Sequence, residues 1–309
     1  MALVDLNQLA LAELFQALVS GDHLDALLRI AIEEDLGGVG DVTTQAHVAA
    51  GVSSSAEVRA RGAGVLAGAP ILDRLLRLHA PRLSWWWNIE DGDSFVTGDV
   101  VLRVAGPLDV LLPVERIMLN LLGRLSGVAT MTARYVAAID GHDVLVCDTR
   151  KTTPGYRALE KYAVGCGGGH LHRIGLHDAF LLKDNHLAED SSADQVLEAA
   201  QTARSHHELR FVEVEVDTLD QMRSLLDPAD RSPAPSDLID IVLLDNMAPD
   251  RLVKAVAWRD RHAPTVQLEA SGGITLDSIA EVAATGVDRI AVGALTHSAV
   301  QVDFGLDLS

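Results

Sequence analysis

The chain has 309 residues, a formal net charge of -19, 48% hydrophobic residues and no low-complexity tract. This composition is typical of a folded protein with one large domain and one smaller one. It argues against nucleic-acid binding, which needs broad basic surfaces, and no apolar run approaches the ~18 residues that span a membrane. Residues 1–24 carry Asp5 and Glu13 within their apolar pattern, which predicts an amphipathic helix and not a signal peptide. We therefore expect a cytoplasmic protein that binds neither nucleic acid nor membrane.

The first part of the chain, residues 1–126, mixes helical and strand patterns. Helices are predicted over 6–19 and 24–34, and strand-like sequence follows over 53–68. Short strands over 91–115 are separated by Gly92, Gly98 and Gly106 at the spacing of an antiparallel layer. These patterns predict an α+β domain.

From residue 126 onward, apolar strands alternate with amphipathic helices. The predicted strands are 144–147, 179–182, 211–216, 239–244, 265–268 and 289–292, and the predicted helices are 157–164, 193–203, 219–226, 249–259 and 276–284. Six or seven βα units in a row predict a parallel sheet curved into a small barrel. Residues 227–237 resemble an inserted loop. The domains are thus expected at 1–126 and 127–298, with a last strand within 299–309 that could return to the first domain.

Polar residues follow the predicted barrel strands at their carboxyl ends. They are Arg150, Lys151, Lys183, Glu215, Asp245, Ser271, Gly272, Gly273 and Gly293. Because the loops at this end of a βα barrel converge on its axis, this face is predicted to hold an active site.

Residues 148–186 reverse the charge of the chain. They contain Arg150, Lys151, Arg157, Lys161, Arg173, Lys183 and four histidines against four acids, and three of the four lysines of the whole protein. Compact ammonium groups suit close contact with oxygen atoms, so the segment is predicted to bind an anion. A solvated basic face is the alternative. The glycine run and the lack of acids between Glu160 and Asp178 favour the anion site.

Two further patterns point to a phosphate and to a metal or ribose. The sequence SGGI at 271–274 is expected to open a helix near Leu276, and with GAL at 293–295 it could form a phosphate cup, although a plain tight turn would look similar. Alternation places Glu213, Glu215 and Asp217 on one strand face. With Asp245, Glu215 could hold Mg²⁺ through water or bind ribose hydroxyls, unless that face is simply solvated.

Arg116, Arg150 and Arg173 are candidates for two-bond contacts with carboxylates. His172 and Lys183 lie in the same basic segment as Arg150 and Arg173. Arg116 alone is equally consistent with a surface arginine on a helix. His170 and His172 could form a metal pair, but the sequence offers no third ligand nearby. Cys147 and Cys166 are too far apart for a metal knuckle and are expected to be reduced thiols.

Several motifs together resemble the quinolinate phosphoribosyltransferases, also called carboxylating nicotinate-nucleotide pyrophosphorylases. They lie at 33–44, 115–130, 148–186, 212–217, 242–246, 269–274 and 286–298, so the resemblance covers nearly the whole chain. It implies an N-terminal α/β sandwich followed by an open barrel, in a homodimer that could assemble further. It also implies the reaction of quinolinate with phosphoribosyl pyrophosphate (PRPP) to nicotinate mononucleotide, pyrophosphate and CO2, with Mg²⁺ as cofactor, in de novo NAD biosynthesis.

The resemblance also assigns roles to residues. Arg150, His172, Arg173 and Lys183 would bind the quinolinate carboxylates with Arg116 of the other subunit. Thr149 and Lys151 would contact substrate, Lys151 on the PRPP side. Glu215 and Asp245 would bind ribose hydroxyls and the metal, and the 5'-phosphate would lie on Ser271, Gly272, Gly273, Gly293 and Ala294. Two alternatives stay open: a Schiff-base barrel aldolase that uses Lys183, and a non-catalytic paralogue that binds small anions or serves in metal uptake.

Overall fold

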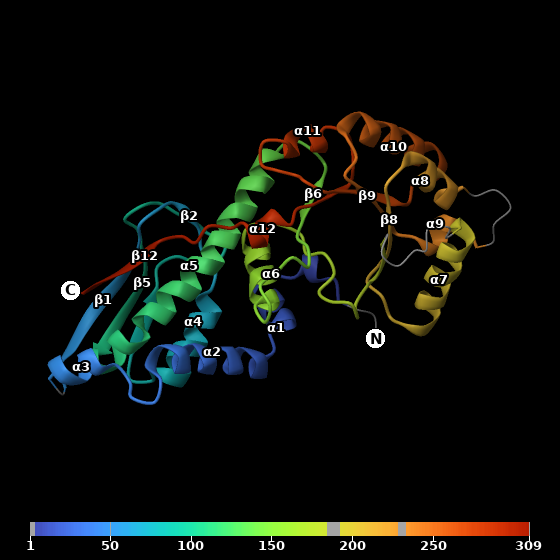
Figure 1. The fold of residues 1–309 in the computed structure, drawn as a ribbon. Helices are drawn as coiled ribbons and strands as arrows, with labels where there is room; N and C mark the ends of the chain where they lie inside the picture. The colour runs from blue at the N-terminus through green and yellow to red at the C-terminus, as the bar shows by residue number, and fades with distance from the viewer. Residues whose placement is uncertain (1–3, 50, 184–191, 228–232, 309) are drawn as a thin grey trace. The chain divides into compact units, whose positions relative to one another are not determined.

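The computed structural model describes residues 4–49, 51–183, 192–227 and 233–308. They form two compact units, whose elements are labelled in Figure 1. The parallel-sheet unit comprises Met1–Asp5, Arg134–Lys151 and Gly169–Ala294, and the α+β unit comprises Leu6–Ala133, Thr152–Gly168 and Leu295–Ser309. No helix in the described part of the chain is long and apolar enough to cross a membrane.

The parallel-sheet unit is built on six strands in the order β6-β11-β10-β9-β8-β7. They are β6 (Leu145–Cys147), β7 (Phe180–Leu182), β8 (Val212–Val216), β9 (Ile241–Asp245), β10 (Gln267–Ser271) and β11 (Arg289–Ala291), and every pairing is parallel. β6 and β7 are consecutive in the chain but lie at opposite edges of the sheet. Among the described strands the barrel is therefore open, as the fold class predicted.

The helices of this unit connect successive strands. They are α7 (Ala193–His206), α8 (Leu219–Leu226), α9 (Pro235–Leu238), α10 (Pro249–His262) and α11 (Ile279–Ala283). Ser192 and Thr218 accept the backbone N–H groups of Gln195 and Gln221, so α7 and α8 begin with capping boxes. α9 lies within the predicted insertion 227–237, of which residues 228–232 fall outside the described part. The core of the unit contains fully buried strand residues such as Val242, Leu244 and Ile290.

The helix between β6 and β7 in the sequence is α6 (Arg157–Cys166). α6 belongs to the α+β unit, where it packs against α1 (Leu11–Leu18). The rings of Phe15 and Tyr162 meet edge to face with centroids 5.1 Å apart. The first βα unit therefore contributes its strand to the sheet but not its helix.

The α+β unit contains a four-stranded antiparallel sheet in the order β12-β1-β5-β3. The strands are β1 (Ser53–Ala60), β3 (Ser84–Trp87), β5 (Val100–Pro107) and β12 (Phe304–Leu308), and β2 (Gly64–Val65) pairs separately with β4 (Ser94–Phe95). Besides α1 and α6, the unit contains a short 3-10 helix (Leu6–Gln8), α2 (Gly21–Leu36), α3 (Val42–His47), α4 (Ala69–His79) and most of α5 (Leu108–Ala138). The C-terminal strand thus pairs with β1 (Figure 1).

The expected domain boundary at residue 126 falls inside α5, which continues to Ala138. Gly123 and Gly127 do not break this helix. Instead, a side chain at either position would overlap the carbonyl oxygen of Val302 or Val300, respectively. Val302 N also donates to Gly123 O at 3.0 Å. The two glycines therefore let the chain that leads into β12 pass directly against the helix backbone.

Candidate active site

The structure places the predicted polar residues at the carboxyl ends of the parallel strands. Thr149, Arg150 and Lys151 follow β6, Lys183 follows β7, Glu215 is the second-last residue of β8, Asp245 ends β9, Ser271 ends β10, and Gly293 follows β11. Asp245 and Ser271 are direct partners in the register of β9 and β10. All predicted site residues except Arg116 lie in the parallel-sheet unit. The residues that follow or end the parallel strands thus lie where the sequence pattern placed them, whereas His172 and Arg173 lie in the segment between α6 and β7.

Lys183 and Glu215 form an ion pair between neighbouring strands. The side chain of Lys183 is 37% exposed and that of Glu215 is 9% exposed. A cation is therefore available at the edge of the sheet next to a carboxylate that is largely withdrawn from solvent. A ligand with its own carboxylate and hydroxyl groups could exchange partners with both side chains.

Asp245 is held by its neighbour, Asn246. The side-chain nitrogen of Asn246 donates to Asp245 Oδ2 at 2.5 Å, and its backbone nitrogen donates to Ser271 O at 2.9 Å. Asn246 has a φ of 51°, which makes it the non-glycine residue in the left-handed region among those described. A Cβ at Gly272 would overlap its side-chain oxygen. Asn246 thus links the acidic end of β9 to the glycine turn after β10.

The predicted phosphate cup is a turn with glycines in left-handed conformations. Gly272 and Gly273 have φ values of 97° and 60°. The prediction that this sequence opens a helix near Leu276 was wrong: α11 begins at Ile279, after a turn in which Ser278 Oγ accepts Thr275 N at 3.0 Å. The strand before it, β10, likewise extends to Ser271 and not only to residue 268. Any phosphate contact here therefore relies on backbone amides of the turn.

Arg150 and Arg173 bring two guanidinium groups into the same part of the unit. Arg173 is buried, and Arg150 is half-buried. Burial and then the positive charge of Arg150 lower the pKa of Arg173, which means that the two cations repel each other across a poorly solvated space. A ligand with more than one negative charge would relieve this repulsion.

His172 lies in a buried charged cluster with Glu213, Glu269 and Arg289. Its Nε2 is 2.9 Å from Glu213 Oε2 and 3.4 Å from Glu269 Oε1, and Arg289 Nε donates to Glu269 at 2.8 Å. Burial lowers the pKa of His172, whereas the two carboxylates outweigh it and favour the imidazolium. However, Nδ1 accepts the backbone N–H of Arg173 at 2.8 Å, and a protonated Nδ1 could not do so. The hydrogen bond assigns a neutral ring with its proton on Nε2.

If the His172 ring is neutral, it does not compensate the charge of the two buried carboxylates, Glu213 and Glu269, and one of them can be protonated instead. Burial, and then the charge of Glu269, raise the pKa of Glu213, so of the two carboxylates Glu213 takes up a proton more readily. Arg289 pairs with Glu269 and balances its charge. His172, Glu213 and Glu269 are close enough together to hold a metal ion, so the expectation that no further ligand lies near His172 was wrong. A metal bound to Nε2 would nevertheless displace its proton to Nδ1, against the Arg173 contact.

Arg116 lies on α5 in the α+β unit, whereas the other predicted site residues belong to the parallel-sheet unit. It is exposed and lines a cavity of about 320 Å³ together with Asp35, Arg124 and Tyr156. The two cysteines behave as expected: Cys147 and Cys166 are free and buried, and burial raises the pKa of each thiol. Neither is suited to act as a nucleophile.

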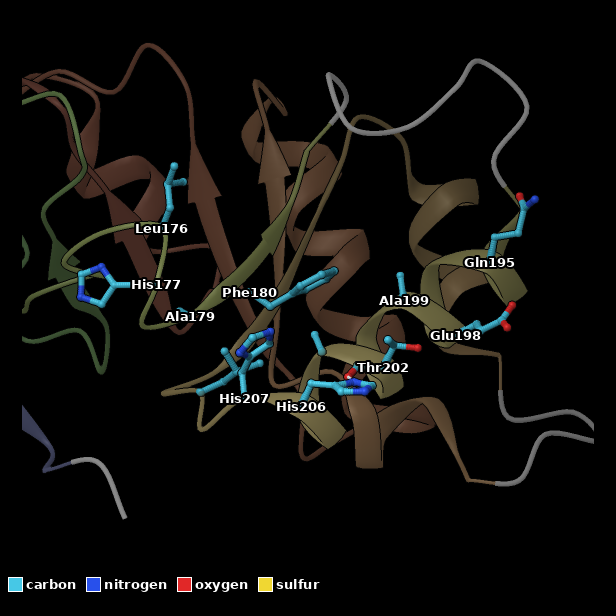
Figure 2. Close-up of a pocket in the computed structure, with 12 residues that line it drawn as sticks. Leu176, His177, Ala179, Phe180, Gln195, Glu198, Ala199, Thr202, His206 and His207 are labelled. Atoms are coloured by element: carbon cyan, nitrogen blue, oxygen red, sulfur yellow. Dashed lines mark hydrogen bonds between the residues drawn. The ribbon is translucent and has the colours of Figure 1, made fainter. Parts of the chain in front are cut away.

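A second cavity, of about 940 Å³, lies beside the edge strand β7 and contains none of the predicted site residues. Figure 2 shows Phe180 of β7 facing Ala199 and Thr202 of α7, with His206 nearby. Phe180 and Lys183 are three residues apart, so they point to opposite faces of an extended chain. The cavity is thus outside the sheet, away from the face that carries Lys183.

Four residues at the site were not singled out from the sequence: Asp148, Asn246, Glu269 and its ion-pair partner Arg289. Asp148, which is fully buried, accepts His172 N at 2.7 Å and holds the segment after β6 against the histidine. Glu269 carries a signal that could have been used, since it lies two residues before Ser271 and faces the interior like Glu213. No comparable pattern marks Asn246, because its role depends on its backbone conformation.

Two family models match the chain. They are described as the N-terminal domain of quinolinate phosphoribosyl transferase, at residues 41–126, and the C-terminal domain, at residues 128–307. The two matches meet inside α5.

Similar proteins and structures agree with these models. The chain is 43% identical to the nicotinate-nucleotide pyrophosphorylase [carboxylating] of Mycobacterium leprae, over 91% of this chain and 95% of the relative. It is 32% identical to quinolinate phosphoribosyltransferase [decarboxylating] 2b, mitochondrial, of Nicotiana tabacum, over 92% and 82%. The solved nicotinate-nucleotide pyrophosphorylase of Francisella tularensis superposes with a TM-score of 0.84 at 33% identity, covering 94% of this chain and 98% of that one.

Proposed function

The chain belongs to the quinolinate phosphoribosyltransferase family, and on this premise we propose that it converts quinolinate and PRPP to nicotinate mononucleotide, pyrophosphate and CO2 in NAD biosynthesis. The observation that carries the proposal is the match of both family models along the chain, and the basic residues Arg150, Arg173 and Lys183 of the parallel-sheet unit suit a dicarboxylate. The two alternatives, an aldolase and a non-catalytic paralogue, find no support in the named relatives.

In the proposed complex the basic residues orient quinolinate. Arg150 and Arg173 hold its carboxylates, and Lys183 leaves Glu215 to join them. Glu215, thus released, accepts hydroxyl groups of the ribose together with Asp245. The 5'-phosphate lies on the amides of Gly272, Gly273, Gly293 and Ala294. His172 holds the Arg173 backbone through Nδ1, and a direct contact with substrate would require its ring to turn.

The reaction breaks the bond between the ribose C1 and pyrophosphate and forms a bond from C1 to the pyridine nitrogen. Positioning accounts for much of the expected rate, because the nitrogen must lie in line with the leaving group. The ring nitrogen becomes positive, so the electron pair left at C2 when CO2 departs is stabilised and then takes a proton from water. We assign to Lys151, in the loop after β6, the role of balancing the charge of the departing pyrophosphate.

Glu215 and Asp245 fit a divalent cation held through water. Both are carboxylates near the ends of adjacent strands, and hard cations prefer such oxygen ligands. Bound Mg²⁺ would neutralise the pyrophosphate and so make it a better leaving group. The direct contact of Asp245 with Asn246 supports a water-mediated arrangement.

We also propose a homodimer in which Arg116 of one subunit completes the site of the other. Arg116 is exposed on α5 and lies in a different unit from every other predicted site residue. Residues shared across a two-fold axis are a common way to build such a site. The cytoplasmic location expected from the sequence stays a prediction.

The test is a comparison of quinolinate with nicotinate, each supplied with PRPP and Mg²⁺. We expect nicotinate mononucleotide and CO2 from quinolinate. Nicotinate should bind more weakly by about 1.5–3 kcal/mol, because one charge-assisted pair is lost, and it cannot release CO2. Formation of nicotinate mononucleotide from both acids at similar rates would overturn the proposal.

A further inference from the structure

Arg124 and Glu160 form a buried ion pair within the α+β unit, outside the residues assigned to substrate. Arg124 lies on α5 and Glu160 on α6, and Arg124 Nη2 is 2.6 Å from Glu160 Oε1. The side chain of Glu160 is fully buried, and that of Arg124 is 20% exposed. We call this pair the Arg124–Glu160 clamp.

The remaining polar atoms of the clamp bind two loops. On one side, Thr153 N and Oγ1 donate to Glu160 at 3.0 and 2.9 Å. On the other side, Arg124 donates to the carbonyl oxygens of Thr296, at 2.6 Å, and Ala299, at 3.0 Å. The clamp therefore joins three segments that are distant in sequence.

These loops continue directly into the proposed PRPP-binding residues. Thr153 follows Lys151 by two residues, and Thr296 follows Ala294 by two residues. Thr296 lies on α12 (Ala294–His297), the short helix that begins at the proposed phosphate contact. The clamp thus holds the chain on the C-terminal side of both Lys151 and the Gly293–Ala294 turn.

Stability alone is a poor explanation for such a pair. A buried ion pair can often be replaced by well-packed apolar residues without loss of stability, because desolvation offsets its Coulomb attraction. What apolar residues cannot reproduce is the directional contact with two carbonyl oxygens, an amide and a hydroxyl. Hydrogen bonds of this kind fix the position of a loop to within a fraction of an ångström.

We propose that Arg124 and Glu160 are positioning residues for PRPP: without touching substrate, they fix the chain directly after Lys151 and directly after Ala294. The inference rests on the proposed function for the identity of the substrate. Quinolinate should depend on the clamp less than PRPP does, because only Arg150 of its proposed partners lies on a loop that the clamp holds, whereas Arg173 and Lys183 lie on other segments.

The variants are Arg124→Lys, Glu160→Gln and the double variant Arg124→Met/Glu160→Leu, with Arg74→Lys as control. Arg74 forms an equivalent two-bond fork with Asp25 in the same unit, at 2.8 and 2.6 Å, but Asp25 contacts neither loop. For each protein one measures KM for both substrates, kcat, the melting temperature, and PRPP binding by calorimetry.

We expect each clamp variant to raise the KM and the Kd for PRPP about tenfold, which corresponds to ~1.4 kcal/mol, and to change the KM for quinolinate less than about threefold. The control should leave both KM values unchanged. The double variant separates position from stability, because it removes the buried charges altogether. If it melts like the wild type and still binds PRPP weakly, positioning is supported.

Unchanged affinity for PRPP in the clamp variants, or equal loss for both substrates, would overturn the inference. If the wild type binds PRPP but makes no nicotinate mononucleotide, the proposed function fails, and the Kd values alone decide the role of the clamp. If the wild type does not bind PRPP, both proposals fall.

Discussion

Lys183 pairs with Glu215, and Lys151 follows β6 in the loop beside Arg150. A compact ammonium can point at one oxygen atom, whereas a guanidinium is broad and planar. We expect Lys151→Arg and Lys183→Arg each to lower kcat/KM about a hundredfold, the effect of displacing a reacting group by about 1 Å, without a change in melting temperature. Lys254→Arg is the control, since Lys254 forms an exposed pair with Asp250 on α10. Near wild-type turnover in both site variants would show that these positions do not need the compact ammonium group of lysine.

Asn246 allows backbone and side-chain effects to be separated at one position. Its φ of 51° suits asparagine and glycine but costs other residues about 1–2 kcal/mol. We expect Asn246→Ala to lose about that much free energy of unfolding in urea, and Asn246→Gly to lose less. Both variants lose the contact with Asp245, so both should need more Mg²⁺ for half-maximal rate. Equal stability of the two variants would show that the left-handed backbone carries no strain.

For single residues, the sequence predicts which charged side chains form the site better than it predicts their hydrogen-bond partners. The charges of Arg150, Lys183 and Glu215 could be assigned to strand ends from alternation alone. The His172 tautomer could not, because it depends on where the backbone of Arg173 turns and on how Glu213 and Glu269 lie across the sheet.

The loop before β7 is organised by the carboxylate of Asp178. It accepts the backbone N–H groups of Ile174 and Gly175, each at 2.9 Å, and pairs with Arg210 at 3.0 Å. Burial opposes ionisation, but these amides and Arg210 outweigh it and lower the pKa of Asp178. This loop leads into β7 and so to Lys183.

We expect Asp178→Asn to lower the free energy of unfolding by about 1–3 kcal/mol near neutral pH. Because the folded-state pKa lies below the unfolded value, this contribution is present above about pH 4 and is lost as the pH falls through the folded-state pKa. The difference between wild type and variant should therefore shrink in acid. Urea unfolding at several pH values measures it, with Asp220→Asn as control because the Asp220 side chain is 93% exposed. A difference independent of pH would contradict the electrostatic explanation.

Helices and strands with a clear hydrophobic periodicity are predicted well from the sequence, whereas the residues at which some of them begin or end are predicted poorly. The helix of 219–226 was placed at its observed bounds, since Thr218 and Gln221 form a recognisable cap. The sequence after Ser271 predicts the start of a helix, because a glycine-rich loop often leads into a helix N-terminus. In the structure a turn comes first, in which the Ser278 hydroxyl oxygen accepts the backbone N–H of Thr275. The hydrophobic pattern of the sequence does not predict this hydrogen bond.

For the whole molecule, the alternation of strands and helices in the sequence indicates the parallel sheet, but it does not indicate which of the helices belong to the same unit as the sheet. The segment 157–166 has an ordinary amphipathic pattern, yet it packs in the α+β unit through Tyr162, whose hydroxyl donates to Asp91 at 2.8 Å. Asp91 lies far away in sequence, so this choice depends on tertiary contacts.

The position of Arg116 makes the sharing of sites between subunits testable. The experiment mixes Arg116→Ala protein with Lys183→Ala protein, each expected to be inactive alone, under conditions in which subunits exchange. Random pairing gives about half mixed dimers, and each mixed dimer has one intact site of two, so about a quarter of wild-type activity should return. A mixture of Lys151→Ala with Lys183→Ala is the matched control, because both residues lie in the same unit and no site in it regains both. If exchange is demonstrated and the Arg116→Ala mixture stays inactive, Arg116 acts within its own chain or has no part in the reaction.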